Sequence, residues 1–180
     1  MPQSPIDDLY RRPGFLIRRA HQIAVALFLE ETGELGITNR QYGILTALKH
    51  QPGLDQISVA KLLGLDRSTT GMVINKLERS GLVERCVADD RRRRNLKLTL
   101  AGAKVLKRLA EPARRAQARA LAPFTPRERV VFLALLDKFT RAFGDQTRVP
   151  LEACRPTERP RGEHSRRVEA AHQAPIPHRL

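Results

Sequence analysis

Residues 66–99 constrain the fold more than any other part of the chain. Asp66 is a residue type that favours a helix N-cap, and the run after it places aliphatic side chains on one helical face and polar or cationic ones on the other. Two strand-like runs, 82–87 and 95–99, follow and flank a tip that ends in four consecutive arginines, 91–94. A polar helix fits a major groove and a basic hairpin neutralises phosphate, so this stretch indicates a protein that holds duplex DNA.

The residues before this stretch predict a partner helix for it. Residues 55–64 read as a short helix that ends at Gly64, a residue suited to a left-handed C-cap. Thr38 and Gln41 have the spacing of a capping box, which predicts a further helix before the short one. Two short helices joined by a tight, glycine-containing turn are typical of a helix-turn-helix.

The flanking segments predict longer helices. Residues 15–31 carry an apolar band that is broader than one neighbouring helix requires, which indicates burial against several helices or a second subunit. A long helix is expected from 100 to about 122, and Pro112 inside it is expected to kink or split it. A second capping box at 125–128 begins an amphipathic last helix.

The two ends of the chain read differently from its middle. We expect residues 1–13 to be an irregular lead-in, because they contain three prolines. Residues 145–180 combine many prolines and arginines with few apolar side chains, and we expect a disordered basic tail there. This tail either adds non-specific affinity for DNA or is simply solvated.

The charge and composition narrow the class of protein. A net charge of +14 favours a polyanionic partner, nucleic acid before an anionic membrane surface, over a merely soluble basic protein. No apolar run approaches the ~18 residues of a membrane span, and the N-terminus lacks the apolar core of a secretion signal. Cys86 and Cys154 form neither a disulfide framework nor a zinc-ligand spacing. These features fit a cytoplasmic protein without a metal, and no enzyme motif is present.

Two motifs resemble one family of bacterial regulators. Residues 90–99, followed by Gly102, match the D-x-R…L-T-x-x-G wing pattern of the MarR family, and residues 77–83 are similar to its L-E-x-x-G-L-V exit from the recognition helix. The resemblance covers about residues 14–144. It implies a mainly α (α+β) winged helix-turn-helix that binds double-stranded DNA at a pseudo-palindromic operator as a homodimer. Residues 37–99 would form the DNA-binding lobe, with dimerisation helices from 14–36 and 100–144.

The exposed side of the helix after Asp66 supplies the expected base contacts. Asn75 has an amide that can read adenine with two hydrogen bonds, and Arg67 or Arg79 can bind guanine or phosphate. The resemblance implies that Arg92 enters the minor groove and that Asp90 positions it. The candidate DNA-binding residues are Gln56, Ser58, Arg67, Ser68, Thr69, Met72, Asn75, Arg79, Asp90, Arg91, Arg92, Arg93 and Arg94.

The resemblance also implies a small aromatic effector that releases the protein from DNA. The run 13–22 is similar to the branch of the family that responds to aromatic acids, which implies an aromatic acyl-CoA thioester such as p-coumaroyl-CoA. His21 is alternatively a core or interface histidine, and the arginines are alternatively solvated or paired across a dimer. The candidate effector-binding residues are Arg18, Arg19, His21, Gln22, Tyr42 and Leu45.

Two function classes remain open at this point. An effector-released repressor of aromatic-compound catabolism predicts binding that depends on sequence and ligand. A ligand-independent structural DNA-binding protein predicts a steep salt dependence with little sequence preference. A peroxide sensor is disfavoured because residues 14–33 contain no cysteine.

Overall fold

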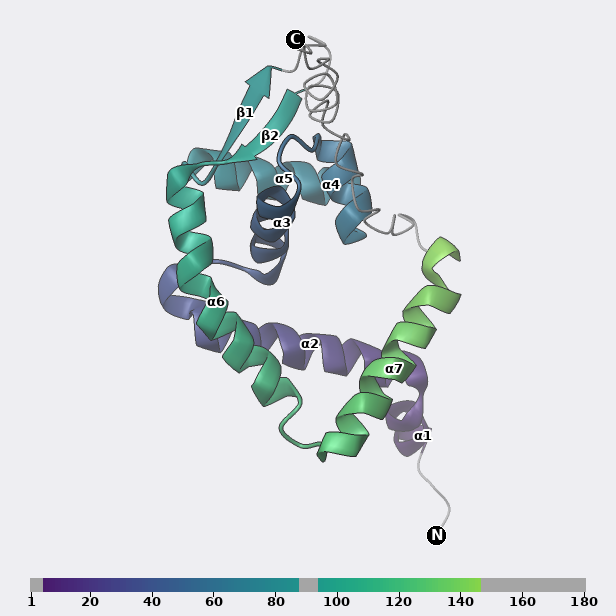
Figure 1. The fold of residues 1–180 in the computed structure, drawn as a ribbon. Helices are drawn as coiled ribbons and strands as arrows, with labels where there is room; N and C mark the ends of the chain where they lie inside the picture. The colour runs from purple at the N-terminus through teal and green to yellow at the C-terminus, as the bar shows by residue number, and fades with distance from the viewer. Residues whose placement is uncertain (1–4, 88–93, 147–180) are drawn as a thin grey trace, which may run out of the picture.

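The computed structural model describes residues 5–87 and 94–146. Figure 1 shows two parts, a lobe built around α3, α4, α5 and the β-hairpin, and a set of longer helices, α2, α6 and α7, that extends away from it. The elements in chain order are α1 (Pro5–Arg11), α2 (Pro13–Thr32), the 3-10 turn η1 (Gly33–Leu35), α3 (Asn39–His50), α4 (Gln56–Leu63), α5 (Arg67–Arg79), β1 (Val83–Val87), β2 (Arg94–Leu98), α6 (Leu100–Ala120), α7 (Pro126–Ala142) and the 3-10 turn η2 (Gly144–Gln146).

The lobe is held together by one apolar core. Ile44 and Leu45 of α3, Ile74 and Leu77 of α5 and Leu96 of β2 are all fully buried in it. The antiparallel strands pair with Val83 opposite Leu98, so the ribbon lays Leu96 and its neighbours onto the helices. Leu98 is partly buried against the same core, so both leucines of β2 hold the ribbon on the helices. The two predicted strands are therefore confirmed, and the winged helix-turn-helix is the fold of this lobe.

The helix boundaries follow from the capping residues. The predicted boxes are present at Thr38 and at Thr125, where each hydroxyl accepts from the third helical N–H and the third side chain bonds back. Asp55 and Asp66 cap α4 and α5, and Gly64 between them has a φ of 61°, the left-handed value that ends α4. These local signals fix the tight turn of the helix-turn-helix.

Two expectations about irregularity are wrong. Residues 5–11 form α1 rather than an irregular lead-in, because prolines are tolerated in a first helical turn and Pro5 and Pro13 each begin a helix. Pro112 does not split α6, which continues unbroken to Ala120, while the kink expected as the alternative stays a prediction. The tail expected from 145 onward begins with the turn η2, and its residues 147–180 lie outside the described part of the chain.

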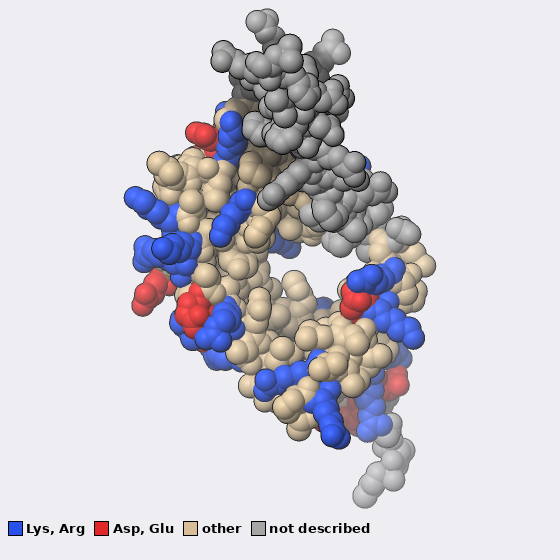
Figure 2. All heavy atoms as spheres, viewed as in Figure 1, with Lys and Arg blue, Asp and Glu red and all other residues tan. Residues whose placement is uncertain are grey.

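Helices α2 and α6 pack along each other outside the lobe. Phe28 is buried with Ala113 and Ala116, small residues that let the two helices approach closely. Charged groups reinforce this contact, because Glu31 binds Arg115 at 2.7 Å and Arg119 at 3.0 Å. Elsewhere on the face seen in Figure 2, Lys and Arg predominate over Asp and Glu, in keeping with the net charge.

Helix α7 presents its apolar side chains to solvent. Phe124 stacks on Phe132 at 4.7 Å and secures the turn into α7, yet the helix itself contains no buried residue. Its exposed large apolar residues are Val130, Val131, Leu133, Leu135, Leu136 and Phe139, and Phe143 follows at its end. Within the described ranges, no helix is both long and apolar enough to cross a membrane.

Candidate DNA-interface and effector groove

Helix α5 turns its polar side outward, as its sequence predicts. Thr70, Ile74 and Leu77 are buried in the lobe. On the opposite side four predicted contact residues are exposed, while Thr69 is half-buried at the edge of this face. The exposed four are Ser68, Met72, Asn75 and Arg79.

The start of α5 is organised by Asp66. Its carboxylate accepts a hydrogen bond from the Ser68 hydroxyl at 2.7 Å and one from the Thr69 backbone N–H at 2.8 Å. These bonds hold the pKa of Asp66 well below its usual range, so the cap is ionised throughout the physiological pH range. Arg67 is exposed beside it, at the positive end of the helix dipole, where a phosphate is also favoured.

A shallow groove crosses this exposed face where α4 meets α5. Gln56 at the start of α4 donates from Nε2 to the Arg67 carbonyl at 3.3 Å and lies across Gly71. A Cβ on Gly71 would come within 2.8 Å of that Nε2 atom, so the glycine makes room for the amide. Ser58 is half-buried one turn further along α4. The groove is lined by Gln56, Arg67, Ser68, Gly71, Met72 and Asn75.

One arginine that the sequence did not single out joins the recognition helix to the ribbon. Arg85 of β1 donates from Nε to Glu78 at 2.9 Å and from Nη2 to the Oδ1 atom of Asn75 at 2.7 Å. The side chain of Arg85 is 22% exposed, so its ion pair with Glu78 is partly shielded from water, while its bond to Asn75 lies at the exposed face. The sequence offered a hint, because Glu78 lies in the last turn of the recognition helix and a cation follows on the first strand. Only the folded hairpin brings the two side chains together.

The wing tip lies largely outside the described residues. Asp90, Arg91, Arg92 and Arg93 fall in the gap, and Arg94 is described only as the first residue of β2. The predicted strands on either side of the tip are present. The roles expected of these residues at the minor groove therefore remain predictions from the sequence.

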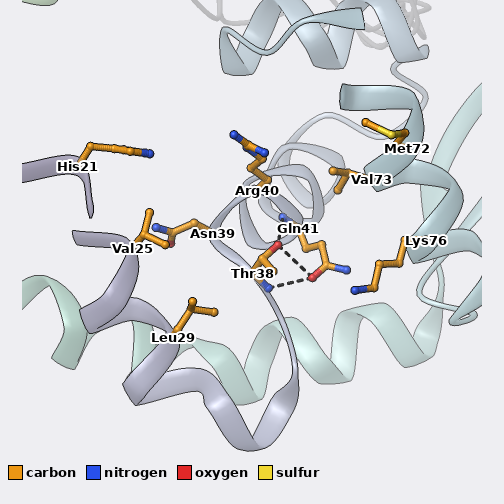
Figure 3. A pocket seen from close by; sticks show the side chains of 10 residues that line it. All are labelled: His21, Val25, Leu29, Thr38, Asn39, Arg40, Gln41, Met72, Val73 and Lys76. Carbon is orange, nitrogen blue, oxygen red and sulfur yellow. Dashed lines mark hydrogen bonds between the residues drawn. The ribbon is translucent and has the colours of Figure 1, made fainter. Parts of the chain in front are cut away.

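A second groove lies between α2, the start of α3 and the side of α5. Its volume is about 490 Å³. Figure 3 shows His21 reaching from α2, and Val73 and Lys76 from α5, toward the first turn of α3. Arg40 and Lys76 supply positive charge, and neither has an acidic partner within the described part of the chain. The lining residues are His21, Val25, Leu29, Thr38, Asn39, Arg40, Gln41, Met72, Val73 and Lys76.

Of the six predicted effector-binding residues, only His21 lines this groove. Leu45 is fully buried in the lobe core, and Tyr42 packs on Phe28 with their ring centroids 5.5 Å apart. The other three are exposed on α2 and do not line the groove: the Arg18 guanidinium lies over the Phe15 ring, and Arg19 donates to Gln22. The spacing of α2 could not show which of its faces turns toward α5.

The cations that do face the groove were missed by the sequence reasoning. Arg40 follows the Thr38 cap of α3, and Lys76 follows Asn75 on the recognition helix. On a helical wheel Met72, Val73 and Lys76 share one flank of α5, at i, i+1 and i+4. This shared flank could have indicated from the sequence that α5 borders a second surface. That the surface lies on α2 is known only from the tertiary fold.

Comparison with known proteins agrees with this geometry. The model of the MarR family matches residues 35–94, which span α3 through the start of β2. A protein described as a transcriptional regulator for the hcr operon of Thauera aromatica is 33% identical over 130 residues, or 71% of this chain and 78% of the relative. This chain belongs to the MarR family. It is a transcriptional regulator of the MarR type.

Solved structures of transcriptional regulators share most of this fold. The PcaV regulator of Streptomyces coelicolor in complex with its natural ligand has a TM-score of 0.68 and 36% identity, and the match covers 79% of this chain and 99% of that one. The CouR repressor bound to a 23-mer DNA duplex has a TM-score of 0.70 and 27% identity, covering 77% and 99%. The similarity therefore extends over the winged-helix lobe and the long helices.

Proposed function

We propose that this MarR-type protein is a repressor that binds a pseudo-palindromic operator as a homodimer and is released by a small aromatic effector. The observation that carries the proposal is the exposed polar face of α5. Ser68, Asn75 and Arg79 stand on it as hydrogen-bonding groups, and Met72 stands on it as an apolar contact for a thymine methyl. Buried Ile74 and Leu77 fix the helix from behind, so the reading groups are presented by a rigid support.

The homodimer is supported by apolar surface that has no partner within the described residues. Helix α7 exposes Leu135 at 60% and Phe139 at 45%, and α2 exposes Leu16 at 53% and Ile23 at 51%. An amphipathic helix whose apolar side is exposed in this way marks an interaction site. A two-fold dimer would bury the same patch on both copies and would present two α5 helices one helical turn of DNA apart, ~34 Å.

The effector proposal rests on the groove between α2 and α5. Val25, Leu29 and Val73 offer apolar contact for an aromatic ring, while Arg40 and Lys76 offer charge for an anion. This chemistry suits an aromatic acid or its CoA thioester, p-coumaroyl-CoA included. A ligand-responsive function is also supported by the similar PcaV regulator, whose structure has been solved in complex with its natural ligand. Met72 lines both this groove and the DNA-facing one, so an occupant contacts the recognition helix directly.

The test combines operator selection with a ligand panel. The full chain is incubated with a pool of random duplexes, and the enriched sequences should be pseudo-palindromes whose binding is lost when one aromatic acid or acyl-CoA from the panel is added. Lys76→Gln should weaken the effect of that ligand about tenfold, because a charge-assisted hydrogen bond is lost. Lys104→Gln, which removes the same charge from the exposed side of α6, is the matched control.

The alternative, a ligand-independent structural DNA-binding protein, gives a different result in the same assay. It would enrich no sequence, its affinity would fall steeply with salt for every duplex, and no ligand would change its melting temperature. That outcome would refute the repressor proposal. A specific operator with no responding ligand would refute only the effector part.

A further inference from the structure

The contact between Arg85 and Asn75 restricts what the recognition helix can read. Asn75 is exposed on α5, and its amide oxygen already accepts a hydrogen bond in the free protein, from the Nη2 atom of Arg85 at 2.7 Å. Arg85 is itself fixed, because its Nε atom donates to Glu78 at 2.9 Å. An arginine has no acceptor, so it must face the amide oxygen and not the amide nitrogen. The orientation of the Asn75 amide is therefore set by Arg85.

This orientation matters because the two ends of an asparagine amide read different base edges. A bidentate contact with adenine needs both ends: Oδ1 accepts from the adenine N6 amine while Nδ2 donates to N7. A carboxamide oxygen has a second lone pair, but the guanidinium charge beside it disfavours the approach of another partly positive donor hydrogen. The free Nδ2 group, with two hydrogens, instead suits an edge that only accepts, which in the major groove is O6 and N7 of guanine.

We infer that Arg85 is a specificity-determining positioning residue, which turns Asn75 into a donor that reads guanine instead of adenine. The inference rests on the proposed function, since it assumes that α5 enters the major groove of an operator. Arg85 lies on β1 and fills this role without contacting a base itself. Glu78 completes the arrangement by holding the guanidinium from its other side, and its side chain is 38% exposed.

The experiment measures which base each protein prefers. If Arg85 only stabilised the fold, replacing it would weaken binding without changing the preferred base. Operators are selected from random duplexes by the full wild-type chain and by Asn75→Ala. The base pair at which the variant loses its preference is the one that Asn75 reads, and it should be guanine. Replacing that guanine by 7-deazaguanine removes the N7 acceptor and should weaken wild-type binding about fivefold to tenfold, with little effect on Asn75→Ala.

Arg85→Met then tests the positioning role. Freed from the guanidinium, the Asn75 amide can turn, and the preference at that pair should shift from guanine toward adenine, with about a tenfold loss of affinity for the guanine operator. Arg114→Met is the matched control, because it removes one arginine and its ion pair with Glu111 from the exposed side of α6. It should leave the selected sequence unchanged.

Several results would overturn the inference. Adenine at the Asn75-dependent pair of the wild-type operator would do so, as would an unchanged preference in Arg85→Met. A uniform loss of affinity for all sequences with a reduced salt slope would show that Arg85 binds phosphate instead. If Arg85→Met does not fold, the wild type and Asn75→Ala still test the inference on operators with guanine, adenine or 7-deazaguanine at that pair. Wild-type binding that prefers adenine there, or that does not weaken with 7-deazaguanine, would overturn it. A wild-type pool without any enriched sequence would overturn the proposed function as well, which separates the two failures.

Discussion

Gly102, the last residue of the wing motif, gives the sharpest prediction about stability. It lies in the first turn of α6, against the chain that leaves the recognition helix. A Cβ at this position would come within 2.1 Å of the Leu82 carbonyl oxygen and 2.8 Å of Leu98 Cδ1, whereas real Cβ contacts essentially never fall below 3.0 Å. Gly102→Ala therefore forces the backbone at Leu82 and the helix apart by at least about 0.9 Å.

The magnitude follows from what that displacement breaks. The Leu82 carbonyl accepts a hydrogen bond from the Thr99 N–H at 3.1 Å, and losing it costs about 1 kcal/mol. Overpacking of this kind adds about 1–3 kcal/mol, while alanine regains about 1 kcal/mol of helix propensity. We expect the free energy of unfolding to fall by about 2 kcal/mol, which lowers the melting temperature by roughly 4–8 °C in a chain of this size.

Thermal and urea unfolding followed by circular dichroism measure the effect. Gly43→Ala is the matched control, because it also lies within a helix but its Cβ would meet only Leu63 methyl groups at an ordinary 3.7 Å. The control should be stabilised by about 0.5–1 kcal/mol. A Gly102→Ala protein that is as stable as the parent would refute the close approach of α6 to the exit of α5.

Three further predictions address pH, DNA and assembly. Hydrogen bonds from Arg115 and Arg119 lower the pKa of Glu31 below its ordinary 4.5, so Glu31→Gln should lower the melting temperature at pH 7. The difference should close as the pH falls from 4.5 through the lowered pKa of the native carboxylate, where that group becomes protonated. Arg92→Ala should weaken operator binding in a mobility-shift assay by about 1–3 kcal/mol per half-site while the circular dichroism spectrum is unchanged. Phe139→Asp should give a folded monomer in light scattering, and a dimer of undiminished stability would contradict the interface proposed for α7.

Local patterns made most of the fold predictable from the sequence. Helix starts at Thr38, Asp66 and Thr125 depend on side chains within three residues, and the structure has each of them. The buried side of α5 follows from its helical period alone. The split expected at Pro112 is absent because a proline removes only one backbone donor, and the packing of Ala113 and Ala116 on α2 keeps α6 continuous around it.

The effector groove could not be predicted in the same way. It depends on which face of α2 turns toward α5, and that is decided by Phe28, which packs on Tyr42 and the alanines of α6. His21 lies two turns before Phe28 and lines the groove, whereas Arg18 lies over the Phe15 ring and Arg19 bonds to Gln22. The apolar band of α2 is so broad that its period leaves this rotation undetermined.

The arrangement of α5 limits how an effector could act. One flank, with Met72, Val73 and Lys76, borders the effector groove, but the helix cannot move by itself because Ile74 is fully buried behind it and Arg85 ties it to the ribbon. We therefore expect an occupant of the groove to displace the lobe as a rigid body relative to α2. Such a movement changes the distance between the two recognition helices of a dimer without changing the bases that each one reads. Operators selected at sub-saturating effector should then keep the same half-site sequence and differ in spacing, and an altered half-site sequence would show that α5 itself is distorted.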